Sequence, residues 1–302
     1  MNKSDINRSP LFYVGDKYKL IEEIKSHFPA GIRHFVEPFV GGGSVYLNVE
    51  ATDYLLNDIN RDVIRLHRML NSFVGREQAF YKKVWRIIDR YGLSCSARED
   101  RVSDELKEQY PKTYFAEFNR EAFLRLRDDF NNLHRKDYVM LYVLLIYGFN
   151  RMIRFNSKGY YNLPVGNVDF NTNTIDALNR YFALNASKRT TWYSLDFERF
   201  INSLDLSPED LIYLDPPYLI TFSEYNKLWN NDTEQRLLAL LDRLSQRNIR
   251  FAISNVTHYK GKVNEAFLKW SANYNIHSIK SNYISYHDNT IKNFNEVLVT
   301  NY

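Results

Sequence analysis

Residues 34–44 read HFVEPFVGGGS. The stretch joins an apolar run of strand length to a glycine triplet, and the serine that follows can begin a helix. A second apolar run, residues 54–57, is followed by Asp58 and then by a helical pattern over residues 61–73. This repeated order of strand and helix predicts a parallel sheet with helices packed on both faces, which is an α/β fold.

The middle of the chain has a different character. From residue 75 onward the sequence is charged and helical, and it includes the apolar stretch VMLYVLLIY at residues 139–147. No linker rich in proline, glycine or serine separates two halves, so an inserted helical domain fits better than two domains in series. Further strands of the sheet are predicted at residues 191–195, 211–214, 249–254, 274–279 and 296–301. A helix over residues 232–245 is predicted between the strands at 211–214 and 249–254.

Composition excludes several classes of protein. The chain has 302 residues, one cysteine, Cys95, and no apolar run of bilayer length, which argues against disulfide scaffolds and membrane spans. The N-terminal MNKSDINRSP has no apolar signal region, so we expect a cytoplasmic protein that does not bind membranes. Forty Lys and Arg against 36 Asp and Glu permit an anionic partner without requiring one.

The sequence LDPPY, residues 214–218, directly follows a predicted strand. Its two prolines have no N–H, so the turn offers carbonyl acceptors, to which Asp215 adds a carboxylate and Tyr218 a flat ring. Such a turn suits a planar substrate with an exocyclic amine. The glycine triplet and Asp58 are expected at the same sheet edge, where Asp58 can bind ribose hydroxyls. The spacing is not GxGxxG, which disfavours a dinucleotide site.

Three segments in this order, VEPFVGGGSV, LLNDIN and DPPY, make the chain resemble the S-adenosylmethionine-dependent DNA adenine N6-methyltransferases of the Dam type. Further matches are YVGDK at residues 13–17, LDFE at 195–198 and the whole stretch 148–166. The resemblance covers nearly the whole chain and implies a prokaryotic or phage-infected cell, in which DNA binding would associate the protein with the nucleoid. It implies methyl transfer to the N6 amino group of an adenine that is flipped out of a short site in double-stranded DNA, GATC or a related one.

The resemblance also implies a division of labour along the chain. Residues 1–74 and 169–302 are expected to form a Rossmann-like methyltransferase domain, and residues 75–168 an inserted helical and β-hairpin domain that recognises DNA. Residues 219–229 are a candidate lid over the flipped base. The implied catalytic residues are Asp215, Pro216, Pro217 and Tyr218. The implied cofactor-binding residues are Tyr13, Gly15, Lys17, Glu37, Pro38, Phe39, Gly41, Gly43, Asp58, Asp196, Phe197 and Asp215, with Asp196 and Phe197 at the adenine ring.

A stretch without acidic residues lies between Asp137 and Asp169. Its arginines and asparagines, Asn167 included, can reach phosphates and base edges, since Arg reads guanine and Asn reads adenine. The resemblance gives Phe149 the place of an aromatic that wedges into the helix. The expected DNA-binding residues are Phe149, Asn150, Arg151, Met152, Arg154, Asn156, Lys158, Asn162 and Pro164.

The chain departs from the family pattern at three positions. Phe12 stands where a Lys used in reading the first guanine of GATC is frequent, and Asp16 and Arg151 each replace a Gly. The exact target site is therefore left open. The histidines, His67 among them, have no metal-ligand spacing, so we expect no metal site and interpret them as surface or hydrogen-bonded core residues. A cognate restriction endonuclease is a conceivable partner, and we expect a monomer.

Two other functions are compatible with these motifs. One is a methyltransferase for another planar amine, such as cytosine N4, adenine in RNA or a glutamine amide, although Asp at the head of the PPY motif favours adenine. The other is a sequence-specific DNA-binding protein without catalytic activity. The intact DPPY and glycine motifs argue against that second alternative.

Overall fold

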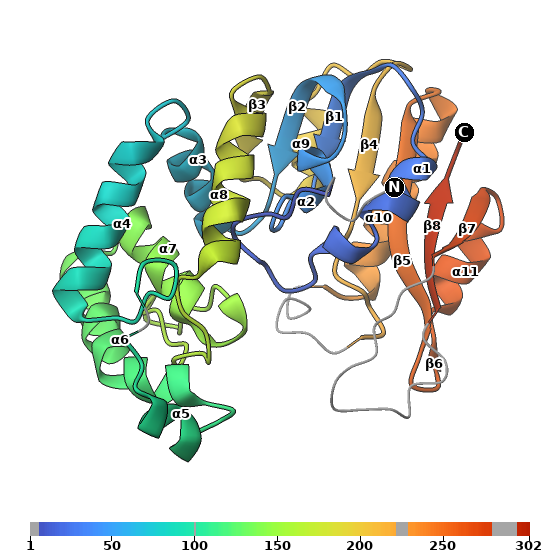
Figure 1. Cartoon of the computed structure of the whole chain (residues 1–302). Coiled ribbons are helices and arrows are strands. Elements are labelled where there is room, and N and C mark those ends of the chain that lie inside the picture. The colour runs from blue at the N-terminus through green and yellow to red at the C-terminus, as the bar shows by residue number, and fades with distance from the viewer. Residues whose placement is uncertain (1–5, 100, 222–228, 280–294) are drawn as a thin grey trace. The chain divides into compact units, whose positions relative to one another are not determined.

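The computed structural model describes residues 6–99, 101–221, 229–279 and 295–302. The chain divides into two compact units (Figure 1). One, the helical unit, consists of residues 1–16, 41–47 and 60–188. The other, the sheet unit, consists of residues 17–40, 48–59 and 189–302. The chain therefore passes between the two units several times before it reaches residue 60.

The sheet unit contains a mixed sheet in the order β3-β2-β1-β4-β5-β8-β7, with β6 paired to β5 (Figure 1). The first five strands of this order are parallel, and β8 runs antiparallel to both of its neighbours. This sheet confirms the predicted α/β fold. Its strands are β1 (Ile32–Glu37), β2 (Ala51–Asn57), β3 (Arg189–Tyr193), β4 (Leu211–Leu214), β5 (Arg250–Tyr259), β6 (Lys262–Val263), β7 (Asn275–Ile279) and β8 (Asn295–Thr300).

The strand order reverses between β1 and β4. From β1 the chain goes on to β2 and β3 on one side, and β4 then pairs with the other side of β1. In open parallel sheets, ligands bind outside the carboxyl ends of the strands at such a reversal. β1 ends at Glu37, because Pro38 has no N–H to continue the ladder. The segments that follow β1 and β4 therefore contain the two motifs singled out in the sequence.

Alternation along the strands separates the two faces of the sheet. On one face, Val36, Ile212 and Leu214 belong to a buried apolar cluster. On the other face, Phe35 and Tyr213 stack with their ring centroids 6.5 Å apart. Three helices complete the cluster, namely α9 (Phe197–Asn202), α10 (Asn231–Gln246) and α11 (Glu265–Ser271). Two short helices, η2 (Lys17–Lys19) and α1 (Ile21–Ser26), come before β1. The predicted helix over residues 232–245 is confirmed as α10.

The helical unit is built around α7 (Tyr138–Tyr147). Each residue from Val139 to Tyr147 is buried, since α3, α4 and α6 pack around this helix. None of the helices in the described residues has the length and apolar composition needed to span a bilayer. The other helices of the unit are α2 (Ser44–Leu47), α3 (Arg61–Asn71), α4 (Glu77–Tyr91), α5 (Asp104–Gln109), α6 (Tyr114–Leu133), η3 (Phe149–Arg151) and α8 (Thr172–Asn185).

Compact packing divides the chain differently from the expected functional domains. Residues 60–74 and 169–188, which were expected in the catalytic domain, group with the helical unit. The reason is that α3 packs against α7 and α8.

A hairpin-like loop over residues 148–166 follows α7. Isolated bridges join Gly148 to Val165 and Phe155 to Tyr161. A Cβ on Gly166 would lie 2.7 Å from the carbonyl oxygen of Gly148, so the two segments can approach this closely only at a glycine. The hairpin expected from the sequence is therefore present.

Candidate active site

Acidic residues follow four adjacent parallel strands of the sheet unit. Glu37 is the last residue of β1, Asp58 follows β2 and Asp215 follows β4, while Asp196 lies three residues beyond β3. Because parallel strands end at the same edge, these four carboxylates share the edge at which the strand order reverses. Glu37 is only 2% exposed.

A buried amide links three of these strand ends. Asn57 Nδ2 donates to the carbonyl oxygens of Pro38 and Leu195, at 3.0 Å each. Asn57 Oδ1 accepts from the backbone N–H of Leu195 at 2.9 Å. Asn57 thus fixes the segments after β1 and β3 against its own strand. The sequence predicts only the end of a strand at Asn57. A polar amide at the end of an apolar strand could have indicated its role in fixing the neighbouring segments.

Asp215 belongs to a compact charged cluster. Lys17 Nζ lies 2.9 Å from Asp215 Oδ2 and 3.5 Å from Glu296 Oε1. The Tyr218 hydroxyl lies 2.9 Å from Asp215 Oδ1 and 3.0 Å from Glu296 Oε1. The side chain of Asp215 is 19% exposed, against 5% for Lys17 and 1% for Glu296. Asp215 is therefore the carboxylate of this cluster that keeps a solvent-accessible edge.

Burial governs the protonation of this cluster. It raises the pKa of Glu296, an effect that Lys17 opposes and Asp215 reinforces. Burial and the two carboxylates also raise the pKa of Tyr218 far above its usual value. Tyr218 therefore keeps its one hydroxyl hydrogen, which it can donate to either carboxylate, and the cluster holds Asp215 in a defined orientation.

Glu296 was not among the residues selected from the sequence. It lies near the start of β8, and because β8 is antiparallel, this end of the strand reaches the carboxyl ends of the parallel strands. An acidic residue at the head of the apolar strand sequence EVLVT was the available signal.

An aromatic group lies at the same edge of the sheet. Phe39 and Phe197 have ring centroids 5.6 Å apart, and Trp229 lies 5.7 Å from Phe39 and 6.0 Å from Phe197. Asp196 is engaged locally: its Oδ1 accepts from the backbone N–H of Glu198 at the start of α9 and from Arg236 Nη2 at 3.0 Å. Phe197 thus belongs to an apolar surface, while Asp196 caps α9 beside it.

In the helical unit, Tyr13 packs on the glycine loop. A Cβ on Gly42 would lie 2.9 Å from Tyr13 Cβ, and one on Gly41 would lie 3.4 Å from the Tyr13 ring. Gly43 has φ +79°, and a Cβ there would lie 2.5 Å from Tyr46. The structure thus brings together two segments that the sequence predicted to bind one cofactor. Packing and backbone conformation already require glycine in this loop.

His67 supports the same loop from α3. Its Nε2 lies 2.9 Å from the carbonyl oxygen of Gly41, to which it donates, since a carbonyl can only accept. Burial lowers the pKa of His67 to about 4, so the ring is neutral at physiological pH. The expectation of a surface or hydrogen-bonded core histidine is confirmed, but its link to the glycine loop was missed.

The departure at position 16 also has a structural role. Ser44 Oγ donates to Asp16 Oδ2 at 2.7 Å and accepts from the backbone N–H of Ser9 at 3.1 Å. Asp16 therefore connects the YVGDK segment to the start of α2. Gly15, its neighbour, has φ +84° and open space around it.

The expected DNA-binding residues lie on η3 and the hairpin of the helical unit. Phe149 is 50% exposed, and Asn150 is exposed with φ +52°. Arg154 donates from Nε to Asn162 Oδ1 at 2.9 Å and from Nη2 to the Asn162 carbonyl at 3.2 Å. Met152 is half-buried, Lys158 and Pro164 are exposed, and the Pro164 carbonyl accepts from the Phe149 N–H.

Two asparagines of this region serve the fold. Asn156 Oδ1 accepts from the backbone N–H groups of Lys158 and Tyr160 and closes the hairpin turn. Asn167 Oδ1 accepts from the N–H of Phe115, and its Nδ2 donates to the carbonyl of Lys112. Asn167 therefore joins the start of α6 to the end of the hairpin, and the expectation that it reaches DNA stays a prediction.

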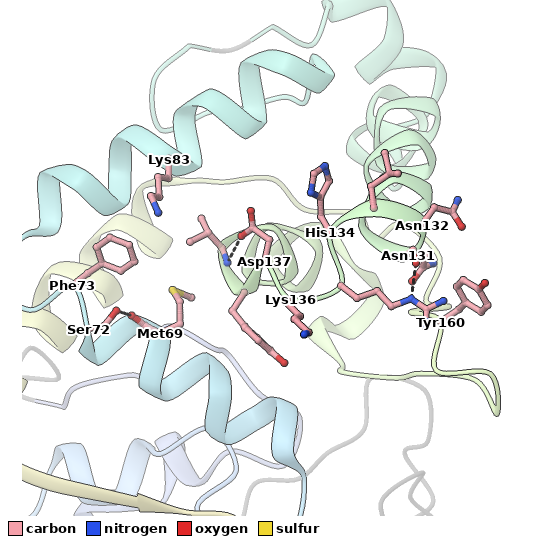
Figure 2. A pocket seen from close by; sticks show the side chains of 14 residues that line it. Met69, Ser72, Phe73, Lys83, Asn131, Asn132, His134, Lys136, Asp137 and Tyr160 are labelled. Carbon is pink, nitrogen blue, oxygen red and sulfur yellow. Dashed lines mark hydrogen bonds between the residues drawn. The ribbon is translucent and has the colours of Figure 1, made fainter.

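A hollow of about 880 Å³ opens elsewhere on the helical unit (Figure 2). It lies between α3, α4 and the connection from α6 to α7, and Lys83, His134 and Lys136 are among its lining residues. No residue that the sequence assigned to catalysis, cofactor or DNA lines it. The Asp137 carboxylate at its edge caps α7. Of the candidate lid, residues 222–228 lie outside the described residues.

The sheet edge has the chemistry that S-adenosylmethionine requires. Carboxylates at Glu37 and Asp58 can accept from hydroxyl and amino groups and favour a nearby cation, whereas a pyrophosphate would be repelled. The rings of Phe39 and Phe197 offer apolar surface for a purine. These residues fit a sulfonium nucleoside better than a dinucleotide.

Comparison with known proteins decides the family. Residues 13–284 match the model of the D12 class N6 adenine-specific DNA methyltransferases. The chain belongs to this family. It is 36% identical to the modification methylase StsI of Streptococcus sanguinis and to the type II methyltransferase M.FokI of Planomicrobium okeanokoites, over 98% of its own length in each case. It is 28% identical to the DNA adenine methylase of Escherichia coli (strain K12) over 82% of its length.

This member of the D12 class spans less than half the length of two of these relatives. It spans 43% of StsI and of M.FokI, and 81% of the Escherichia coli DNA adenine methylase. Each D12 motif noted in the sequence, from YVGDK to DPPY, lies within the matched residues.

Proposed function

We propose that this chain transfers a methyl group from S-adenosylmethionine to the N6 amino group of an adenine in a short site of double-stranded DNA. The observation that carries the proposal is the fixed carboxylate of Asp215 at the carboxyl end of β4, held by Lys17 and Tyr218. Membership of the D12 class supports adenine over cytosine as the target base.

The cofactor would be held by residues that follow β1, β2 and β3. Glu37 and Asp58 supply acceptors for its hydroxyl and amino groups, and Phe39 and Phe197 supply apolar surface. We assign Tyr13, Gly15, Gly41 and Gly43 to the same site through the motifs they belong to. When bound, S-adenosylmethionine supplies an electrophilic methyl group on a positively charged sulfur.

Asp215 would orient the target amine. An ionised carboxylate has about four lone-pair sites, so Asp215 keeps acceptor capacity beyond its contacts with Lys17 and Tyr218. The Pro216 carbonyl is a second acceptor, since the DPPY turn carries no N–H at either proline. Two acceptors on the N6 hydrogens pull the nitrogen toward a tetrahedral geometry and free its lone pair for attack.

Tyr218 would form one wall for the flipped base. Its hydroxyl is anchored between Asp215 and Glu296, which limits rotation of the ring. The target amine is inaccessible inside a duplex, so the base must leave the stack. Phe149, exposed on η3, is the side chain that we assign to filling the space it leaves. Residues 1–74 and 169–302 remain our proposal for the catalytic domain, and residues 75–168 for DNA recognition.

We further propose that methylation protects DNA against a cognate restriction endonuclease. Two relatives are named modification methylase StsI and type II methyltransferase M.FokI, which supports this role. We expect the chain to act as a monomer on a site that contains adenine, and GATC is one candidate.

The test is transfer of a labelled methyl group from S-adenosylmethionine to duplex DNA, followed by digestion to nucleosides. We expect N6-methyladenine from the wild type and a loss of about 10²–10³-fold in turnover for Asp215→Ala, with DNA and cofactor binding retained. Asp205→Ala, at an exposed acid of the same unit, is the matched control. N4-methylcytosine would reassign the substrate, and no transfer at all would favour a DNA-binding protein without catalysis.

A further inference from the structure

Two guanidinium groups converge on one aromatic ring in the helical unit. The guanidinium carbon of Arg151 lies 4.0 Å from the centre of the Phe12 ring, and that of Arg8 lies 4.7 Å from it. Phe12 and Arg151 are 139 positions apart, so the pair exists only in the folded chain. Both are positions at which the sequence departs from the family pattern.

The backbone on both sides of this pair is strained. Phe12, Asn150 and Arg151 have φ of +48°, +52° and +50°, and they are three of the five non-glycine residues with positive φ among those described. Bulky residues avoid this region, and such strain persists only where surrounding structure enforces it. Two residues before Phe12, the Pro10 carbonyl accepts from the Tyr142 hydroxyl at 3.1 Å, which attaches this segment to α7.

The Arg151 guanidinium finds no acceptor within the part of the chain that the structure describes. It makes no hydrogen bond or ion pair with any residue that the structure describes, although it is more than half covered. Burial lowers its pKa to about 10, so it stays charged at neutral pH. Asp169 is the acid that acts on it electrostatically, but both oxygens of Asp169 are bonded to Ser96.

This arrangement is unfavourable unless something completes it. A covered cation without an acceptor raises the free energy of the fold, and the second guanidinium, that of Arg8, adds like-charge repulsion. An external group with acceptor atoms would relieve both costs. The Phe12 ring contacts the Arg151 guanidinium but offers it no acceptor atom, so the N–H groups can bind that group.

We propose that Arg151, held against the ring of Phe12, reads a guanine in the DNA site through the O6 and N7 atoms of that base. A planar guanidinium has the fork geometry that matches these two acceptors, and this is the commonest base-specific contact of arginine. The inference rests on the proposed function, because it takes DNA as the ligand. It adds a specificity-determining residue at a position where the family pattern has glycine.

Binding selection tests the inference separately from catalysis. The full chain, with S-adenosylhomocysteine present, selects duplexes from a pool in which every position around one adenine is randomised, and the bound DNA is sequenced. We expect the wild type to select a guanine at one position and Arg151→Ala to lose that preference by about 5- to 150-fold. The other positions should keep theirs. Failure to methylate would contradict the proposed function and leave this result intact.

Two further variants distinguish the planar shape of the Arg151 guanidinium from its positive charge. Arg151→Lys keeps the charge but not the planar fork, so it should lose the same guanine preference. Phe12→Leu keeps an apolar contact without the flat ring and should weaken that preference at the same position. Thermal unfolding shows whether Arg151→Ala folds. If it does not, the other two variants, which disrupt the structure less, still test the inference.

The control is an arginine that stacks on an aromatic ring and has its own acid. Arg98 lies 4.8 Å from the centre of the Trp85 ring and is paired with Asp89. Arg98→Ala should leave the base preferences unchanged. The inference is wrong if Arg151→Ala weakens binding to all sequences equally with a smaller salt dependence, which marks a phosphate contact. It is equally wrong if the preferences of Arg151→Ala match those of the wild type.

Discussion

The hydroxyl group of Tyr218 lies 3.0 Å from Oε1 of Glu296, 78 residues further along the chain. This contact places a second buried carboxyl behind Asp215 in the DPPY motif. The same Glu296 oxygen lies 3.5 Å from Lys17 Nζ. Lys17 and the Tyr218 hydroxyl therefore each contact both carboxyl groups, those of Asp215 and Glu296. Tyr218 and Lys17 therefore hold Asp215 through a cluster whose charge depends on pH.

Glu296→Gln should change how stability depends on pH. The folded chain raises the pKa of Glu296, so its stabilising contribution is present at low pH and is lost as pH rises through that raised value. Gln does not titrate, so the free energy of unfolding of the variant should not show this decrease with rising pH. Urea unfolding curves between pH 4 and 8 measure it. Since Gln still accepts from Tyr218, turnover should fall by less than about tenfold.

Glu234→Gln is the matched control for this experiment. Glu234 is 1% exposed, its pKa is also raised by burial, and it is bonded to Asn255 and Asn264. It should reproduce the change in stability without any change in turnover. A similar loss of turnover in both variants would mean that Glu296 acts only through the fold.

Lys17→Met should destabilise the chain by about 3–5 kcal/mol near neutral pH, because it leaves two neighbouring carboxyl groups without their cation. Without Lys17 the pKa of Glu296 should rise further, and the stability gap to the wild type should widen between pH 5 and 8. Chemical unfolding at several pH values measures this. Lys19→Met, at an exposed lysine of the same short helix, should show no such trend.

Gly43→Ala should destabilise the helical unit by about 2–5 kcal/mol, because the new methyl group meets the Tyr46 ring and the backbone has positive φ. Gly75→Ala is the control, since Gly75 has φ +75° but open space around it, and should cost only about 1–2 kcal/mol. Thermal unfolding gives both values. Equal costs would show that the loop adapts to the methyl group.

Arg154→Ala and Asn162→Ala should relax discrimination at the same base position. Arg154 donates from Nε to the Asn162 side-chain oxygen and from Nη2 to the Asn162 backbone carbonyl, so Asn162→Ala removes the first bond and loosens the arginine that we assign to base contact. Each variant should lose about 1–3 kcal/mol of discrimination, and the double variant little more. Additive losses, or effects at different bases, would show that the two side chains act separately.

Lys158→Ala provides a contrast within the same hairpin. Lys158 is exposed at the turn, and as a phosphate contact it should weaken binding to all sequences alike. Binding measured from 50 to 200 mM salt should show a smaller slope, by about one, than the wild type.

Local pattern was sufficient for much of the sheet. Each predicted strand and the α10 helix could be read from short runs of apolar residues, because their period reflects which side chains meet the core. The position of Asp215 after β4 also followed, since a motif directly after a parallel strand must lie at the sheet edge. The resemblance, carried by six segments of the sequence, then predicted the reaction.

The domain boundaries were harder to place. Residues 61–71 form α3 as the periodicity predicted, but they pack with α7 rather than only with the sheet. Periodicity shows that a helix has an apolar face and does not show which partner covers it. Only the tertiary structure therefore shows that residues 60–74 group with the helical unit.

The sequence by itself determined the α/β class, the D12 motifs and the residues next to them, because these depend on neighbours along the chain. Tertiary structure decided that Glu296 joins Lys17, Asp215 and Tyr218. It also decided that His67 binds the glycine loop and that the Arg151 guanidinium packs on the Phe12 ring. Each of these contacts joins residues far apart in sequence, and only the antiparallel entry of β8 or the packing of helices brings them together. Long-range pairing leaves no local periodicity, so such contacts can be seen only in the folded chain.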